Sequence, residues 1–328
     1  MIKLSRQRAA EILKTLAGQN VVVLGDVMLD EFVWGDVTRI SPEGPVPVVD
    51  VKRESAHLGG AANVLANLVA LGARGSVIGV VGDDRAGEEL KRKLTHAANG
   101  SADNLVTVKS RPTTTKTRIV AHSQLVVRTD RELRLPVEPT IEDEIIDKVK
   151  TVVSSAHALV ISDYDKGAVT PRILKSVLPI AYKRIPVLID PKLRNFTSYT
   201  PATLVTPNHH EALRMSNTEE DTDDGLLSAA DLIRKKLSCD AVLITRGDKG
   251  MMLLEKQGGP VYVGTAAREV YDVTGAGDTV IAALASALAG GASMVEAAVF
   301  ANHAAGIVVG KVGTATANGD ELLKTFDA

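Results

Sequence analysis

The chain has 328 residues, of which 45% are hydrophobic, 24% charged and 3% aromatic, as in ordinary globular proteins that bury one large core or two smaller ones. Lysine and arginine number 38 against 40 aspartates and glutamates. This near balance excludes a strongly basic surface for nucleic acid or an anionic membrane, so we expect a small-molecule partner. The one cysteine, Cys239, excludes an intramolecular disulfide and a multi-cysteine metal cluster, which favours a cytoplasmic protein.

Hydrophobic patterning predicts alternating strands and helices. Residues 1–18 lack the apolar core of a signal peptide and carry apolar residues at helical spacing. Short Val/Ile/Leu runs follow, typical of strands buried on both faces, at 21–25, 76–81, 158–162, 187–190, 202–206 and 241–245. Helical patterns lie between them, at 60–71, 86–97, 141–153 and 226–237. This order predicts an α/β fold with a doubly wound, mainly parallel sheet and helices on both faces.

Two segments, roughly 32–53 and 113–130, alternate apolar and polar residues without a helical period. We expect them to pair as a small antiparallel β lid, inserted into a single domain that spans 1–328, and to exclude water when substrate binds. Two plain surface hairpins are the alternative. An exposed apolar sheet also favours a homodimer through the lid.

The apolar run from Val280 to Ala298 is the one segment that resembles a membrane span. Gly290, Gly291 and Ser293 divide it, and Glu296 lies within its second half. We therefore expect two short buried helices in a soluble protein.

A glycine-rich turn precedes that run, at Asp272-Val273-Thr274-Gly275-Ala276-Gly277-Asp278-Thr279. Small residues at the start of a helix let a phosphate approach free backbone N–H groups at the positive end of the helix dipole. Asp278 then lies where an attacking hydroxyl loses its proton. The alternative is an ordinary helix start capped by Thr274 or Asp272.

Together with three further segments, this turn resembles the signature motifs of the ribokinase (PfkB-type) sugar kinases. The segments are Gly25 to Asp30, Leu58 to Ala66 and Asn208 to Glu211, and the resemblance covers nearly the whole chain. It implies an ATP-dependent kinase that uses Mg²⁺. Four motifs in the right order are more specific than any one of them.

The resemblance implies a role for each motif residue. Asp30 and Asn63 bind sugar hydroxyls, and Gly59-Gly60 bring backbone close to the sugar. Asn208 and Glu211 hold Mg²⁺ through water, although an acid in a first helical turn is also explained by the dipole alone. Asp278 is the general base. The remaining residues form the anion hole (Gly275, Ala276, Gly277), the nucleotide loop (Thr245, Gly247), the adenine contact (Asn302) and a monovalent cation site (Asp272, Thr274).

Basic residues indicate a substrate that already carries a phosphate. Lys116, Arg118 and Arg128 lie in the expected lid, with Arg131 and Arg134 just beyond it. They are candidates for contacts with this phosphate, although Lys and Arg also protect strand edges. Lys166 and Lys192 follow two of the expected strands and are candidates for contacts with phosphate groups.

Four segments resemble the kinases that act on D-glycero-β-D-manno-heptose 7-phosphate: Ile40 to Pro47, Thr115 to Arg118, Ser162 to Gly167 and Asp190 to Lys192. This resemblance implies phosphorylation of O1 to the 1,7-bisphosphate, toward the heptose of the lipopolysaccharide inner core. Many such kinases are fused to a nucleotidyltransferase. This chain ends at Ala328 without a His-x-Gly-His signature, so we expect no adenylyl transfer; a single-function kinase and a chain cut short both remain open.

Two other functions remain as alternatives. One is a related kinase of a fructose-like sugar or sugar phosphate. The other is a sugar-binding regulator that has lost its chemistry, against which the intact turn at 275–278 argues. The sequence does not decide the oligomeric state or the monovalent cation preference.

Overall fold

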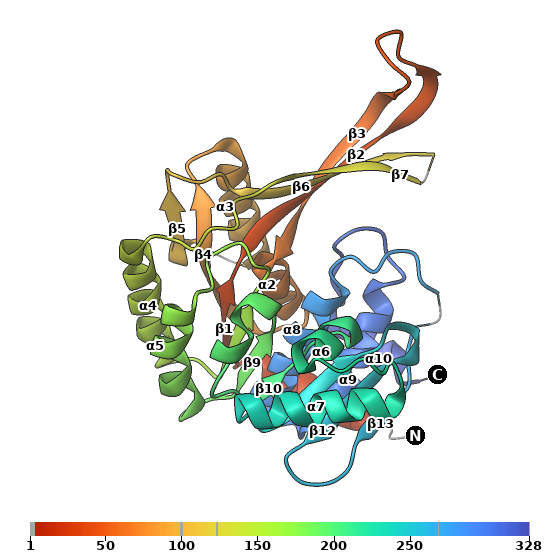
Figure 1. Ribbon diagram of the computed structural model, residues 1–328. Helices are drawn as coiled ribbons and strands as arrows, with labels where there is room; N and C mark the ends of the chain where they lie inside the picture. The colour runs from red at the N-terminus through yellow and green to blue at the C-terminus, as the bar shows by residue number, and fades with distance from the viewer. Residues whose placement is uncertain (1–3, 99–100, 123, 268, 328) are drawn as a thin grey trace.

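The computed structural model describes residues 4–98, 101–122, 124–267 and 269–327. A nine-stranded sheet forms its centre and a four-stranded sheet projects from it (Figure 1). The strand order of the central sheet is β13 (Val261–Val263), β12 (Met251–Glu255), β11 (Ala241–Thr245), β10 (Leu204–Val205), β9 (Val187–Asp190), β8 (Ala158–Ser162), β1 (Asn20–Gly25), β4 (Arg74–Gly82) and β5 (Leu105–Val108).

Helices cover both faces of the central sheet. One face packs against α1 (Arg6–Leu16), α2 (Ala61–Ala70), α3 (Arg85–Ala98), α8 (Ala276–Ala289), α9 (Met294–Val308) and α10 (Gly319–Thr325). The other packs against α4 (Pro139–Val153), α5 (Pro171–Tyr182), α6 (His209–Ser216) and α7 (Asp223–Leu237). Two separate hydrophobic cores result.

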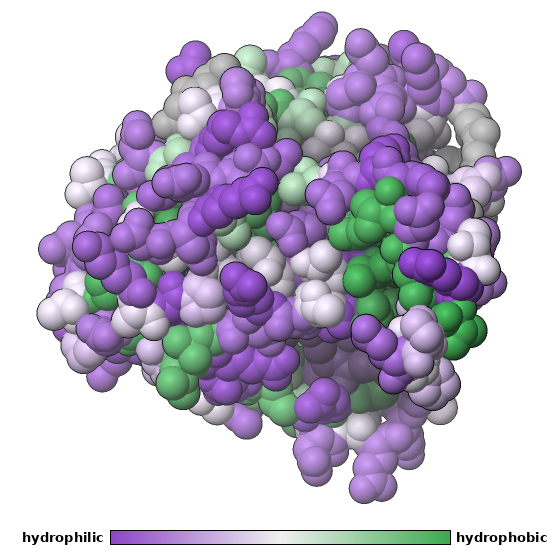
Figure 2. Space-filling model, turned by 90° about the horizontal axis from the view of Figure 1, so that it is seen from above, coloured by the Kyte–Doolittle hydropathy of each residue, from purple (hydrophilic) through white to green (hydrophobic). Residues whose placement is uncertain are grey.

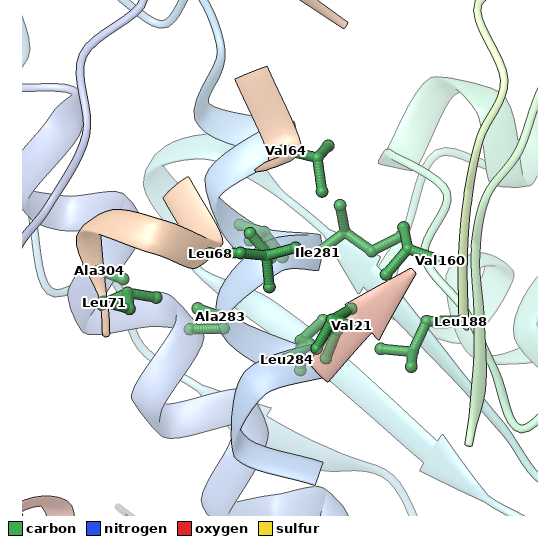
Figure 3. Packing of buried hydrophobic residues seen from close by; sticks show 14 of the residues in the cluster. Val21, Val64, Leu68, Leu71, Val160, Leu188, Ile281, Ala283, Leu284 and Ala304 are labelled. Carbon is green, nitrogen blue, oxygen red and sulfur yellow. The ribbon is translucent and has the colours of Figure 1, made fainter. Parts of the chain in front are cut away.

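Strand β1 shows how one sequence serves both cores. Val21 and Val23 point into the core with α2 and α8, whereas Val22 and Leu24 point into the core with α4 and α5. Figure 3 shows Val21 beside Leu284 of α8, with Leu188 of β9 nearby. Because both faces of β1 are buried, its residues must be apolar at successive positions and not only at every second one.

Strand β1 pairs in parallel with β8 on one side and with β4 on the other. Strands that follow in the chain are added on one side up to β5 and on the other side from β8 onward, so the order of the strands switches at β1. Ligands in doubly wound sheets bind outside the carboxyl ends of the strands at such a switch point. The segments that follow β1, β8 and β9 all lie at this edge, and α8 begins there.

The second sheet has the order β3 (Pro47–Gly60), β2 (Val27–Ile40), β6 (Thr114–Ala121), β7 (Gln124–Arg131). Only Asp26 separates β2 from β1, so the sheet continues directly from the switch point and extends away from the body (Figure 1). The β2–β3 and β6–β7 pairs are antiparallel. The central β2–β6 pair is parallel, so the sheet is mixed where the sequence suggested antiparallel pairing throughout.

The predicted fold class is confirmed, and most element boundaries agree within a few residues. Strands β5, β12 and β13 were missed. The run from Val280 forms two helices, α8 and α9, with Gly290 as the C-cap of α8. Among the described residues, no helix has both the length and the apolar character that a bilayer crossing requires.

Candidate active site

Asp278 lies in the first turn of α8 and is only 1% exposed. Each of its carboxylate oxygens accepts a hydrogen bond from a neutral donor. Asn63 Nδ2 of α2 donates to Oδ2 at 2.8 Å, and the Tyr164 hydroxyl, from the segment after β8, donates to Oδ1 at 2.8 Å. Three elements distant in sequence thus position this one side chain.

Burial raises the pKa of Asp278 to about 7. The hydrogen bonds from Asn63 and Tyr164 lower the pKa, Asp30 raises it, and Lys192 lowers it. A carboxyl group with a pKa near neutrality is suited to accept a proton and release it again.

The turn before α8 carries the three backbone N–H groups that the sequence suggested as an anion hole, and one of them is bonded within the turn. Gly275 has φ of 79°, and a Cβ there would lie 2.7 Å from Asn63 Nδ2, so only glycine fits. The Ala276 N–H donates to the Val273 carbonyl at 3.2 Å. In the part of the chain that the structure describes, the N–H groups of Gly275 and Gly277 have no acceptor. Of the three amides proposed for the anion hole, that of Ala276 is therefore occupied.

Asp30 of β2 is 4% exposed and forms an ion pair with Arg118 of the neighbouring strand β6. A Cβ on Gly59 would collide with the Asp30 carboxylate, which explains this glycine by internal packing. The sequence had suggested that Gly59 brings backbone close to the sugar. Gly60 has φ of 56° and caps α2, so it turns the chain into the helix that carries Asn63.

Residues 163–168 after β8 are held by two buried carboxylates. Asp26 accepts N–H bonds from Tyr164, Lys166 and Ala168 at 2.8 to 3.0 Å. Burial, and next the charge of Asp163, raise the pKa of Asp26 to about 6. The resemblance to heptose kinases included this segment, but Tyr164 was not identified as a site residue. Its hydrogen bond joins residues 114 positions apart, which no sequence pattern indicates.

A cavity of about 160 Å³ lies beside Asp278. Its lining comes from the ends of the central strands and from α6 and α8: Tyr164, Asp190, Lys192, Thr206, Asn208, Glu211, Thr245, Gly277 and Val280. Burial raises the pKa of Asp190 to about 8; Lys192 opposes this rise, and the acids Glu211, Asp278 and Asp163 add to it. The sequence indicates Asp190 only as part of the segment Asp190 to Lys192. The lining of the cavity therefore combines two acids, Asp190 and Glu211, with one lysine.

Asn208 and Glu211 form a capping box at the start of α6. Asn208 Oδ1 accepts the Glu211 N–H at 2.9 Å, and Glu211 Oε2 accepts the Asn208 N–H at 3.0 Å. Glu211 Oε1 pairs with Lys192. Within the described ranges, no three His, Cys, Asp or Glu side chains are grouped to bind a metal directly. The capping role is present, and both side chains also line the cavity.

The cations at the base of the second sheet are paired with acids. Lys166 Nζ lies 2.8 Å from Glu132 Oε2, and Lys116 Nζ lies 3.8 Å from the same oxygen and 3.6 Å from Asp130. Arg128 pairs with Asp130 at 2.9 Å. Lys116 and Lys166 thus meet at one carboxylate, whereas Arg128 lies at a more exposed position.

The remaining predicted residues lie near the last strands. Thr245 ends β11 and forms a bridge with Asn208. Gly247 has φ of 58° and open space around it. Asn302 Nδ2 of α9 donates to the Gly264 carbonyl at 2.8 Å. A hollow of about 710 Å³ lies along α9, lined by Ala266, Glu269, His303, Gly306, Ile307, Gly310, Lys324, Thr325 and Asp327.

The model of the pfkB family of carbohydrate kinases matches residues 19–320. The chain belongs to this family. Among curated relatives, the Bifunctional protein HldE of Pelobacter propionicus is 42% identical over 98% of this chain, and that of Geobacter metallireducens is 46% identical over 93%. These matches cover 66% and 62% of the relatives, so the chain spans just under two thirds of their length.

Solved structures share the pfkB-family fold at lower identity. Arabidopsis thaliana ribokinase, complexed with ribose and ATP, has a TM-score of 0.73 at 21% identity, and the match covers 94% of this chain and 99% of that one. Escherichia coli phosphofructokinase-2 has a TM-score of 0.77 at 21% identity, covering 94% and 98%. These similarities establish the ribokinase-like architecture.

Proposed function

We propose that the chain transfers the γ-phosphoryl group of ATP to O1 of D-glycero-β-D-manno-heptose 7-phosphate, giving the 1,7-bisphosphate used for the lipopolysaccharide inner core. The observation that carries the proposal is 42–46% identity over nearly the whole chain to relatives named Bifunctional protein HldE. The four segments that resemble heptose 7-phosphate kinases support the choice of sugar. We also propose that the reaction takes place in the cytoplasm.

Asp278 is the proposed general base. A sugar hydroxyl held by Asp30 and Asn63 would give its proton to the Asp278 carboxylate as the oxygen attacks phosphorus. The N–H groups of Gly275 and Gly277 would receive the charge of the transferred group. Because Asn63 contacts Asp278 directly, it would align both substrate and base.

The donor set of the cavity fits a Mg²⁺–ATP complex. Carboxylate and amide oxygens of Asp190, Glu211 and Asn208 line it, and Mg²⁺ prefers oxygen ligands and retains most of its waters. Asn208 and Glu211 would hold the ion through water, while Lys192 would contact a phosphate. The bound ion supplies neutralisation of phosphate charge. Thr245 and Gly247 would contact the nucleotide, and the hollow along α9 near Asn302 would hold its base.

Lys116 and Lys166 are the proposed contacts for the 7-phosphate. Their shared partner Glu132 is an acid that a phosphate dianion can replace, since both offer oxygens to the same ammonium groups. Arg118 would orient Asp30, and Arg128 would attract the anion from the edge of the sheet. The second sheet would act as the lid over the sugar.

A coupled assay with Mg²⁺–ATP and a panel of sugars tests the function. We expect turnover of the heptose 7-phosphate and little of ribose, fructose or fructose 6-phosphate. Turnover of ribose or fructose 6-phosphate without the heptose phosphate would contradict the choice of sugar and leave a related kinase. No phosphorylation of any sugar would favour a binding protein.

We also propose a homodimer through the lid. Its outer residues Ile40, Val51, Leu125 and Val127 are 46–61% exposed, and apolar surface is visible from the lid side (Figure 2). Light scattering should give twice the mass of one chain. The double variant Leu125→Asp/Val127→Asp should give one chain mass, and a monomeric wild type would contradict the proposal.

A monovalent cation site beside Asp272 and Thr274 is a further proposal. Asp272 accepts N–H bonds from Thr274 and Gly313, both at 2.9 Å, and so joins the two loops beside the start of α8. We expect activity to rise when K⁺ replaces tetramethylammonium at constant ionic strength. Equal activity in both salts would contradict it.

A further inference from the structure

Tyr164 contacts four separate parts of the candidate active site. Its N–H donates to Asp26 at 2.8 Å, and its hydroxyl donates to Asp278 at 2.8 Å. Lys192 Nζ lies 5.6 Å from the centre of its ring. A Cβ built on Gly60 would lie 3.5 Å from the ring, so the ring packs against the start of α2. These contacts hold the side chain in one place.

The segment that carries Tyr164 is itself firmly held. Asp26 binds three of its N–H groups, and Asp163 accepts hydrogen bonds from Asn195 and Tyr199, both at 2.7 Å. Both aspartates are at most 2% exposed. The hydroxyl of Tyr164 is therefore delivered to Asp278 by a rigid support and not by a mobile surface loop.

Asn63 and Tyr164 together use one acceptor position on each oxygen of Asp278. A carboxylate has about four such positions, so each oxygen keeps a free lone pair. Tyr164, which donates to Oδ1, and Gly277, the residue before Asp278 in the chain, both line the 160 Å³ cavity. A base held by two donors cannot rotate away from an incoming hydroxyl.

We propose that Tyr164 is the positioning residue for the base: its hydroxyl fixes the Asp278 carboxylate in orientation and stabilises its ionised form. This inference rests on the proposed function, in which Asp278 takes a proton from the sugar. Asn63 holds the second oxygen but can also bind the sugar, whereas the Tyr164 hydroxyl acts through Asp278.

The charges around Asp278 explain why such a donor is needed. Asp30 of β2 opposes ionisation of Asp278 and Lys192 after β9 favours it, while Asp278 in turn raises the pKa of Asp190 of β9. Burial is the largest influence and also opposes ionisation. The two neutral donors, Asn63 and Tyr164, offset part of the effect of burial and of Asp30. Loss of the Tyr164 hydroxyl should raise the pKa of Asp278. Loss of the whole ring should also disturb packing at Gly60.

The test is the variant Tyr164→Phe, which keeps the ring and removes the hydroxyl. A hydrogen bond to a charged group accounts for a pKa change of about 1–2 pH units. In a plot of kcat against pH, we expect the acid limb to move to higher pH by that amount. At pH 7 the kcat should fall about 5- to 50-fold, and at pH 9.5 it should return to within a few-fold of wild type. Tyr182→Phe, which removes a hydroxyl bonded to Asp240, is the matched control and should leave the profile unchanged.

A second readout does not need turnover. The side-chain carboxyl carbon of Asp278, assigned by comparing ¹³C-aspartate-labelled wild type with Asp278→Asn, should titrate about 1–2 pH units higher in Tyr164→Phe. An unchanged titration, or a kcat lowered equally at every pH, would overturn the positioning role. If wild type phosphorylates no sugar, the proposed function fails, and the titration still decides whether Tyr164 stabilises the ionised carboxylate.

Discussion

The start of α8 and the second sheet present charges to the site in different ways. Asp278 is buried and held by two neutral donors, from α2 and from the segment after β8. Lys116 and Arg128 of the second sheet, and Lys166 beside its base, are instead held by carboxylates; their side chains are 15%, 49% and 9% exposed, respectively. A buried charge with fixed neutral partners is suited to chemistry, because its environment does not change. A cation held by a carboxylate can exchange that acid for another anion, which suits binding and release of a charged substrate.

The largest expected effect is on turnover, when the buried Asp278 is replaced. Asp278→Asn should lower kcat by about 10²–10⁴-fold, because the base is lost, while the affinity for ATP stays within a few-fold of wild type. A coupled assay and calorimetric titration measure the two quantities. Asp147→Asn, an exposed position on α4, is the control. Near-normal turnover in Asp278→Asn would remove the distinction between the two regions.

The same substitution should stabilise the fold. The pKa of Asp278 is about 7 in the folded protein and near 4 in an unfolded chain. The fold is therefore favoured by this group below about pH 4, and that advantage is lost as the pH rises to 7. Asparagine does not titrate, so the gain in unfolding free energy should grow from pH 4 to 7, reach the order of a few kcal/mol, and then level off. Urea unfolding of both proteins at several pH values measures it; a gain that shrinks with pH would contradict the buried-charge account.

At the second sheet, the expected effect is on substrate binding. Lys116→Ala or Lys166→Ala should raise KM for the phosphosugar about 10- to 100-fold, because each removes a charge-assisted contact, with KM for ATP unchanged. Lys52→Ala removes an exposed ion pair with Asp50 in the same sheet and should change neither constant. If both lysines behave like Lys52, they do not bind the phosphosugar.

The smallest effect tests the space beside Asp278. A Cβ on Gly277 would meet nothing within 4 Å, so Gly277→Ala should fold normally. The methyl group would occupy part of the cavity, and we expect KM for ATP to rise about tenfold. Gly44→Ala, also in open space but in the turn of the second sheet, is the control. An unchanged KM would indicate that phosphate does not approach this amide.

The fold class followed from the sequence because buried parallel strands are continuous apolar runs. The antiparallel pair β12 and β13 was missed because β13 has only three residues. At the site, Asp278 and Asn63 were identified from local motifs, and the structure brings them into contact. Tyr164 and Asp190 were not identified as site residues, since their importance depends on burial beside distant residues. The packing reason for Gly59, an Asp30 carboxylate on the adjacent strand, likewise depends on strand register.

The most direct test of the account is ³¹P NMR of the wild-type chain and Asp278→Asn with Mg²⁺–ATP and D-glycero-β-D-manno-heptose 7-phosphate. We expect the wild type to form ADP and a second sugar phosphate resonance, coupled to the anomeric proton, in equal amounts. Asp278→Asn should form neither over the same period. A wild-type product phosphorylated elsewhere than O1, or equal product from both proteins, would contradict phosphoryl transfer to O1 through a base at the start of α8.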